Sequence, residues 1–199
     1  MTARTSRVLL TAAAFLTSLV LVFAVVLLVL RGHSASGPVQ AAAIGGPFRL
    51  IDQNGRPFTD QDLKGRPFLV FFGFTNCPEI CPTTLFEVSE VLRRLGPDAD
   101  RARALFITVD PERDTPDKLK DYISSFDPHL IGLTGDPDAI AATAKAYRVY
   151  SKKVSLEGGS YTMDHSTIVY LMDKEGRFVA PFSLKRKPEE SAAELRRYL

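Results

Sequence analysis

The segment Val8–Leu30 restricts this chain most, because its 23 consecutive residues include no charged side chain. About 20 apolar residues are enough for a helix to cross the hydrocarbon core of a bilayer. A cleavable signal peptide has a shorter apolar core, of roughly 7–15 residues. The segment therefore predicts a retained transmembrane helix within an N-terminal anchor, residues 1–31. The alternative is a signal peptide that a peptidase removes, because the small residues Ala41–Ala43 could form a cleavage site.

The charges around this segment predict its orientation. Arg4 and Arg7 precede it and only Arg31 follows closely, so the positive-inside rule leaves the N-terminus in the cytoplasm. We therefore expect a single-pass protein of the inner membrane whose C-terminal domain is periplasmic. The formal net charge is +2, and without these three arginines the rest of the chain is about neutral. This balance argues against a nucleic-acid-binding protein, because such a protein needs a basic face.

After the anchor, residues 32–46 lack charged side chains and predict a flexible linker, and residues 47–199 predict one domain. Strand-like and helix-like segments alternate through this domain and end in a hairpin and a helix. This order indicates an α/β domain with a thioredoxin-like fold. The expected strands are Phe48–Ile51, Pro57–Phe58, Phe68–Phe74, Leu105–Val109, Leu130–Leu133, Thr167–Met172 and Phe178–Phe182, and the expected helices include Pro116–Phe126, Pro137–Tyr147 and Glu189–Tyr198.

The chain has two cysteines, Cys77 and Cys81, and both directly follow the predicted buried strand Phe68–Phe74. In open α/β sheets, ligands bind beyond the carboxyl ends of the strands. Pro82 favours the first position of a helix, so we expect the cysteines in a turn at a helix N-terminus, where free N–H groups stabilise a thiolate. Two thiolates at this spacing can hold one soft ion such as Cu(I). A plain disulfide or a pair of buried, inert thiols would be the structural alternatives.

A histidine could supply the third ligand. His33 lies in the linker and is expected to be solvated, and His129 precedes a strand as a turn residue, which leaves His165. Two sulfurs and one imidazole would form a three-coordinate Cu(I) site and could accommodate Cu(II). Met163 shares a face with His165 in an extended segment, which makes it a reserve thioether ligand, although core filling is its simpler role. Asp164 either orients the imidazole or caps a turn.

Four short segments resemble the Sco/SenC family when taken together: Phe72–Pro82, Asp110–Pro116, Leu133–Gly135 and Asp164–Ser166. The resemblance covers roughly Pro47 to Leu199, and the anchor agrees with it. It implies a thioredoxin-like fold in which Cys77, Cys81 and His165 bind copper as Cu(I) or Cu(II). It also implies a role in assembling the CuA centre of cytochrome c oxidase subunit II, as copper donor, as reductant of that centre's cysteines, or both. Other periplasmic copper chaperones or thiol reductants would then be partners.

Three other functions are compared with this one. A thiol–disulfide oxidoreductase without obligatory metal transfer needs only Cys77 and Cys81 as redox-active residues. A peroxiredoxin-like peroxidase is disfavoured, because Thr75 lies only two residues before Cys77 and Pro67 is far upstream. A purely structural tethered domain leaves the cysteines and His165 unexplained. The acidic segment Asp110–Pro116 is interpreted as a turn with local ion pairs, and a role beside the site or in docking is its alternative.

Overall fold

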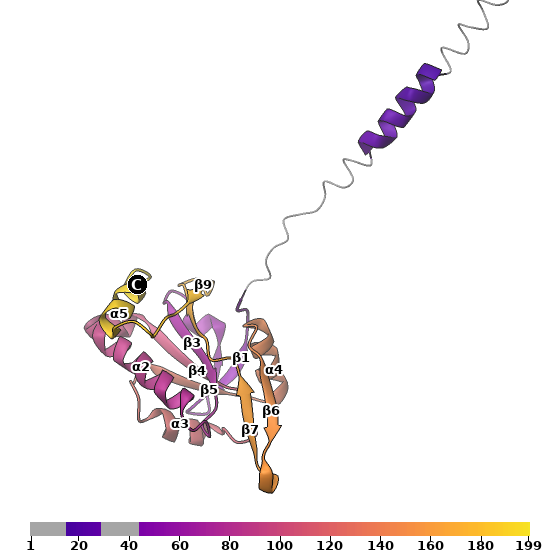
Figure 1. Ribbon diagram of the computed structural model, residues 1–199. Helices are drawn as coiled ribbons and strands as arrows, with labels where there is room; N and C mark the ends of the chain where they lie inside the picture. Colours follow the sequence, from indigo (N-terminus) through magenta and orange to yellow (C-terminus); the bar gives the residue numbers. More distant parts are fainter. Residues whose placement is uncertain (1–14, 29–43) are drawn as a thin grey trace, which may run out of the picture. The chain divides into compact units, whose positions relative to one another are not determined.

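The computed structural model describes residues 15–28 and 44–199, which belong to two separate units. Residues 15–28 form a helix with exposed side chains (Figure 1). Within the described ranges, no helix has both the length and the apolar character needed to span a membrane. The predicted transmembrane helix Val8–Leu30, within the predicted anchor of residues 1–31, extends beyond the described residues on both sides. His33 and most of the predicted linker also lie outside them.

The second unit is built on a seven-stranded mixed sheet (Figure 1). Its strand order is β2-β1-β5-β4-β3-β8-β9, in which β3, β4 and β5 run parallel and the other neighbours pair antiparallel. Strands β6 and β7 form a separate two-stranded sheet. The strands are β1 Arg49–Asp52, β2 Pro57–Thr59, β3 Phe68–Gly73, β4 Arg103–Thr108, β5 Leu130–Thr134, β6 Ser151–Ser155, β7 Tyr161–His165, β8 Val169–Met172 and β9 Phe178–Pro181.

The core of the domain follows the central strands. All six residues of β3 are buried, as are the last five of β4. Such continuous apolar runs are typical of parallel strands covered on both faces, and the strand predicted over Phe68–Phe74 is confirmed. The end of β3 therefore lies at the carboxyl edge of a fully packed sheet, which holds the residues that follow it in place.

Four α-helices surround this sheet: α2 Ile80–Leu95, α3 Pro116–Ile123, α4 Pro137–Ala146 and α5 Pro188–Arg196. Short 3-10 helices cover Asp60–Leu63, Gly96–Arg101 and Glu157–Gly159. Helix α2 packs against α5, α3 against β5 and α4 against β1. The predicted caps are confirmed, because Thr115 and Asp136 each accept a backbone hydrogen bond at the start of a helix whose first residue is proline.

The predicted hairpins also form. Gly55 and Gly176 both have positive φ, at 78° and 75°, in the turns between β1 and β2 and between β8 and β9. The strand expected to begin at Thr167 begins at Val169. The α/β arrangement expected from the alternation of strands and helices is confirmed. The hairpin of β6 and β7, drawn in orange in Figure 1, was not predicted.

One local prediction was wrong. Pro82 was expected at the first position of the helix after the cysteines, but α2 begins at Ile80 and includes Cys81. Proline is tolerated at the third helical position, because the N–H groups of the first turn have no partner inside the helix. Cys81 is therefore part of the first turn of α2, and only Cys77 remains in the preceding loop.

Candidate metal centre

The loop between β3 and α2 carries the two cysteines in different environments. Cys77 is half-buried and Cys81 is buried, and both are free thiols. The backbone N–H of Cys77 donates to the Phe74 carbonyl at 3.2 Å, which closes the loop. The backbone N–H of Cys81 has no carbonyl partner within α2, because it belongs to the first turn of that helix. It donates instead to Cys77 Sγ, and the nitrogen–sulfur distance is 3.3 Å. The helix N-terminus thus contacts the more accessible sulfur.

Gly73 allows the buried sulfur to lie against the end of β3. A Cβ atom at this position would lie 2.8 Å from Cys81 Sγ and 2.7 Å from the ring of Phe106. Both distances are too short for a side chain at residue 73, so the close packing of Cys81 depends on the glycine. Gly73 was not identified from the sequence as a site residue, although a glycine at a strand end is the usual signal of such a close approach.

His165 is the last residue of β7 and reaches the cysteines from the other side. Its Nε2 lies 3.6 Å from Cys81 Sγ, and its Nδ1 lies 2.9 Å from the Ser166 carbonyl oxygen. A carbonyl only accepts, so Nδ1 carries the proton and Nε2 presents its lone pair to the sulfurs. The Ser166 carbonyl, rather than Asp164, therefore orients the imidazole.

Two aromatic rings flank this imidazole. The rings of Phe71 and Phe74 pack edge-on to His165, with centroid distances of 6.2 and 5.7 Å. Both phenylalanines are buried. They limit the orientations of the ring and exclude water from one side of the site, so the ligand atom stays close to the sulfurs.

The three predicted ligands come together. One atom from each of Cys77, Cys81 and His165 lies within 4.8 Å of the other two, which makes them the group of His, Cys, Asp and Glu side chains among the described residues that could hold a metal ion. Soft thiolates together with an imidazole nitrogen fit copper and zinc better than hard cations such as Mg²⁺ or Ca²⁺. The chemistry of the donors therefore agrees with a site for one soft metal ion.

The thiols differ from the sequence-based expectation in one respect. Burial raises the pKa of Cys81 well above its ordinary value, and the nearby Cys77 and Asp114 add to the increase, although the backbone of Phe74 opposes it. Thiolate stabilisation by the helix N-terminus is therefore outweighed at Cys81. A bound metal cation would reverse this balance, because a coordinating thiol is deprotonated.

Neither Asp164 nor His129 belongs to this group, and Met163 has the core-filling position that was its simpler expected role. Met163 is half-buried and packs against the core, and Asp164 is exposed. His129 lies in a turn before β5, where its Nδ1 is 2.6 Å from Asp127 and its Nε2 is 3.2 Å from Asp100. The expectation of a turn histidine is confirmed, and His129 provides a matched control for experiments on His165.

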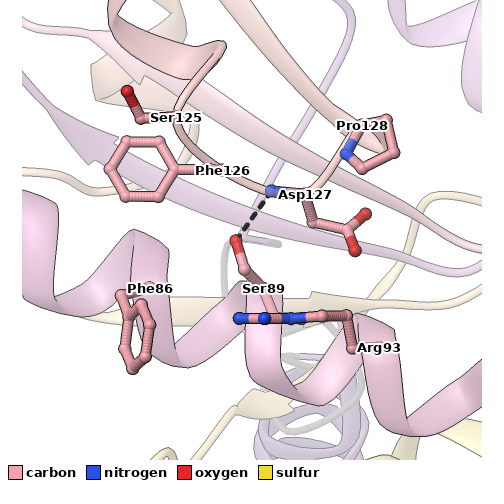
Figure 2. A pocket seen from close by; sticks show the side chains of 7 residues that line it. All are labelled: Phe86, Ser89, Arg93, Ser125, Phe126, Asp127 and Pro128. Carbon is pink, nitrogen blue, oxygen red and sulfur yellow. Dashed lines mark hydrogen bonds between the residues drawn. The ribbon is translucent and has the colours of Figure 1, made fainter.

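A pocket of about 350 Å³ lies between α2 and the turn before β5 (Figure 2). The Asp127 N–H donates to Ser89 Oγ at 3.0 Å across its floor. Its charged groups already have partners, since Arg93 pairs with Glu90 and Asp127 with His129. None of its lining residues is a candidate metal ligand. These residues are Phe86, Ser89, Arg93, Ser125, Phe126, Asp127 and Pro128.

Known proteins are similar over most of the chain. The model of the SCO1/SenC family matches residues 36–199. A SCO2-like protein of Rickettsia felis is 42% identical over 149 residues, which cover 74% of this chain and 73% of the relative. The mitochondrial protein SCO2 of Saccharomyces cerevisiae is 44% identical over 142 residues, which cover 70% of this chain and 47% of the relative.

Solved structures agree with these sequence matches. The structure of Bradyrhizobium japonicum ScoI with copper bound is 64% identical, with a TM-score of 0.77, and the match covers 79% of this chain and all of that chain. Arabidopsis thaliana ScoI with copper bound is 38% identical, with a TM-score of 0.71, and the match covers 78% of this chain and all of that chain. The thioredoxin-like fold and the resemblance noted in the sequence are both confirmed: the chain belongs to the SCO1/SenC family.

Proposed function

We propose that the protein binds one copper ion through Cys77, Cys81 and His165 and takes part in assembling the CuA centre of cytochrome c oxidase. The observation that carries the proposal is the convergence of the three ligand atoms within 4.8 Å. The copper bound in the related structures supports the choice of metal. One related structure, 23% identical to this chain, is described as that of a member of a family of cytochrome c oxidase assembly proteins.

The ligand set suits both oxidation states of copper. Soft sulfur ligands favour Cu(I), and an imidazole nitrogen is a good ligand for Cu(II) as well. Cys81 is buried whereas Cys77 is half-exposed, so an incoming ligand reaches the metal from the Cys77 side. Copper can then be passed to an acceptor thiolate by stepwise ligand exchange, in which Cys77 is the first ligand to be replaced.

Copper binding is tested on the full chain in detergent by competition with a chromogenic Cu(I) chelator. Cys77→Ser and Cys81→Ser should each abolish stoichiometric binding, and His165→Ala should weaken Cu(II) binding more than Cu(I) binding. His129→Ala is the matched control, because the ring nitrogens of that histidine lie beside Asp127 and Asp100 and it is not part of the group of Cys77, Cys81 and His165. Full Cu(I) and Cu(II) affinity in His165→Ala would refute the three-ligand site.

A thiol–disulfide exchange role is the second candidate, supported by two free thiols of unequal exposure. The Cys77 thiolate would attack a disulfide of the partner and release one partner thiolate, which takes up a proton. Cys81 would then lose its proton and displace the second partner thiol, which leaves a Cys77–Cys81 disulfide. Two electrons pass to the partner in this exchange, and a separate thiol reductant must restore the dithiol.

The two roles are separated with the CuA domain of oxidase subunit II as the partner. Copper-loaded protein is added to the reduced, metal-free domain, and copper-free dithiol protein is added to the oxidised domain. CuA absorbance reports copper delivery, and alkylation of free thiols reports reduction. Delivery from the loaded protein supports the donor role, whereas activity of the copper-free protein alone favours the reductase role.

We further propose that residues 1–31 anchor the protein in the inner membrane, with the N-terminus in the cytoplasm, and that residues 32–46 link the anchor to a periplasmic copper-binding domain of residues 47–199. The uncharged run Val8–Leu30 and the excess of arginine before it support this topology. In bacterial cells, a C-terminal tag should remain with carbonate-washed membranes and be digested by protease added to spheroplasts. A protected tag would contradict the proposed topology.

A further inference from the structure

The turn that follows β4 contains two buried carboxylates. The side chains of Asp110 and Asp114 are 2% and 0% exposed. The turn is closed by the backbone N–H groups of Arg113 and Asp114, which both donate to the Asp110 carbonyl at 3.1 and 3.0 Å. Aspartates are almost never this buried unless they are paired or hydrogen-bonded. Residues 110–114 are called the Asp110–Asp114 turn below.

Asp114 binds the loop that carries the cysteines. Its Oδ2 accepts from the Thr75 backbone N–H at 3.0 Å and from the Thr108 hydroxyl at 2.6 Å, and its Oδ1 accepts from the Thr75 hydroxyl at 2.6 Å. Thr75 lies two residues before Cys77. Three donors on one buried carboxylate hold the start of the loop at a defined position relative to β4.

Asp110 binds the strand that carries the histidine. Its Oδ1 accepts from the Tyr161 hydroxyl at 2.8 Å, and its Oδ2 pairs with Arg113 Nε. Arg113 Nη1 donates to the Tyr161 carbonyl at 2.9 Å, and its guanidinium lies 3.7 Å from the centroid of the Tyr161 ring. Tyr161 is the first residue of β7 and His165 is the last. The carboxylate and the guanidinium therefore hold one end of the strand whose other end supplies the imidazole.

This contact matters because β6 and β7 form a sheet of their own. No ladder joins them to the seven-stranded sheet within the described part of the chain, and His165 lies 84 residues after Cys81. Main-chain pairing restricts only the C-terminal side of His165, because β8 begins four residues later at Val169 and pairs with Phe71 of β3. The other end of β7 has no such pairing to the large sheet among the described residues. The Asp110–Asp114 turn touches both the cysteine loop and the Tyr161 end of β7, and its hydrogen bonds add the second connection between them.

We propose that Asp110 and Asp114 are positioning residues that hold the thiol-bearing loop and the imidazole-bearing strand at the spacing needed for three-ligand copper binding. This inference rests on the proposed function. Arg113 Nη2 is buried and has no hydrogen-bond partner among the described residues, so the guanidinium depends on Asp110 and the Tyr161 carbonyl for its position. Loss of the Asp110 carboxylate removes the contact to the Tyr161 hydroxyl and also the ion pair that holds Arg113 against the Tyr161 carbonyl.

Loosening the strand and loosening the loop have different consequences. A displaced His165 leaves two sulfurs, which still bind Cu(I), whereas Cu(II) loses its nitrogen ligand. A displaced Cys77 weakens the binding of both oxidation states. Variants on the Asp110 side should therefore weaken Cu(II) binding selectively, and Asp114→Asn should weaken both.

The test uses two measurements on each variant of the full chain in detergent. The first is its affinity for Cu(I) and for Cu(II), and the second is the imidazole nitrogen coupling of its Cu(II) form in electron paramagnetic resonance. Tyr161→Phe removes the hydroxyl that binds Asp110 and keeps the ring under Arg113. We expect its Cu(II) affinity to fall by about 10-fold or more, with weaker nitrogen coupling and a smaller change in Cu(I) affinity. Asp110→Asn should act in the same direction.

Ser191→Ala is the control for lost stability, because it also removes one buried hydroxyl, which donates to the Ser183 carbonyl at 3.0 Å, on a helix without candidate ligands. Its copper affinities and spectrum should equal those of the parent chain. Parental Cu(II) affinity and nitrogen coupling in Tyr161→Phe would overturn the inference, even if the aspartate variants fail to fold. Failure of His165→Ala to affect copper binding would instead refute the proposed function.

Discussion

Replacing Gly73 by alanine tests whether copper binding depends on the close approach of Cys81 to the end of β3. The added Cβ would lie 2.8 Å from Cys81 Sγ, and ordinary contact begins at 3.4 Å, so the sulfur must move by about 0.6 Å. Metal–ligand distances tolerate only about 0.2 Å. The ring of Phe106, at 2.7 Å, closes the other side, so the backbone has little room to adjust. Overpacking of this kind costs about 1–3 kcal/mol of folding free energy.

We therefore expect Gly73→Ala to lower both the midpoint of urea unfolding and the Cu(I) affinity measured by chelator competition. Gly132→Ala is the matched control, because its Cβ would also be crowded, at 3.3 Å from Leu119 and 3.4 Å from Ile123, but touches no candidate ligand. The control should keep the Cu(I) affinity of the parent chain. Parental Cu(I) affinity in folded Gly73→Ala would refute the argument that the glycine positions Cys81.

Three further predictions concern single side chains. Cys77 should react with iodoacetamide much faster than Cys81, because burial shields Cys81 and raises the pKa of its thiol. Mass spectrometry of partly alkylated protein should find the label on Cys77, and equal labelling of both cysteines would contradict this prediction. Asp136→Ala should cost about 1 kcal/mol in urea unfolding, since it removes the N-cap bond of α4, and an unchanged midpoint would show that the cap contributes nothing. Burial raises the pKa of Asp52, but hydrogen bonds from Arg56 outweigh this effect and leave the pKa below the ordinary value of 3.8. The ionised carboxylate therefore stabilises the fold above pH 3.8, and this contribution is lost as the pH falls through the folded pKa. Asp52→Asn should therefore be less stable than the parent at pH 7, with a difference that shrinks below about pH 4, and a difference independent of pH would contradict the linkage.

Local signals predicted much of the fold, because they act within a few residues. The apolar run of β3 is typical of a covered strand, and the pairs Thr115-Pro116 and Asp136-Pro137 marked two helix starts to the residue. The start of α2 was predicted two residues too late, because the prediction placed Pro82 at the first helical position and not at the third. Sequence alone does not distinguish the first from the third helical position, since neither needs the N–H that proline lacks.

The hairpin of β6 and β7 was not predictable from its own pattern. All five residues of β6 are exposed, so Ser151–Ser155 shows no alternation of buried and exposed positions. Its partner strand is only partly buried and contains a mixture of polar and apolar residues. Tertiary contacts, above all those of Tyr161 with Asp110 and Arg113, hold this hairpin, and such contacts leave no periodic signal.

The candidate ligands could be identified from the sequence because of their chemistry. The distances between their ligand atoms could not be predicted from the sequence. Cys77 and Cys81 were notable as the only cysteines, and His165 was singled out partly by excluding the other two histidines. The distance of 3.6 Å between Cys81 Sγ and His165 Nε2 depends on segments 84 residues apart. The acidic turn after β4 was interpreted as a local feature, whereas its two buried aspartates contact both of these segments.

The separate sheet of β6 and β7 also makes local opening part of the chemistry. Because its ladder is independent of the seven-stranded sheet among the described residues, it can open without unfolding the core. Each opening removes the imidazole and leaves the two thiols in place. When reclosing is faster than exchange, the hydrogen-exchange rate of the amides in β7 therefore reports the fraction of molecules in which β7 is open and only the two thiols remain at the site.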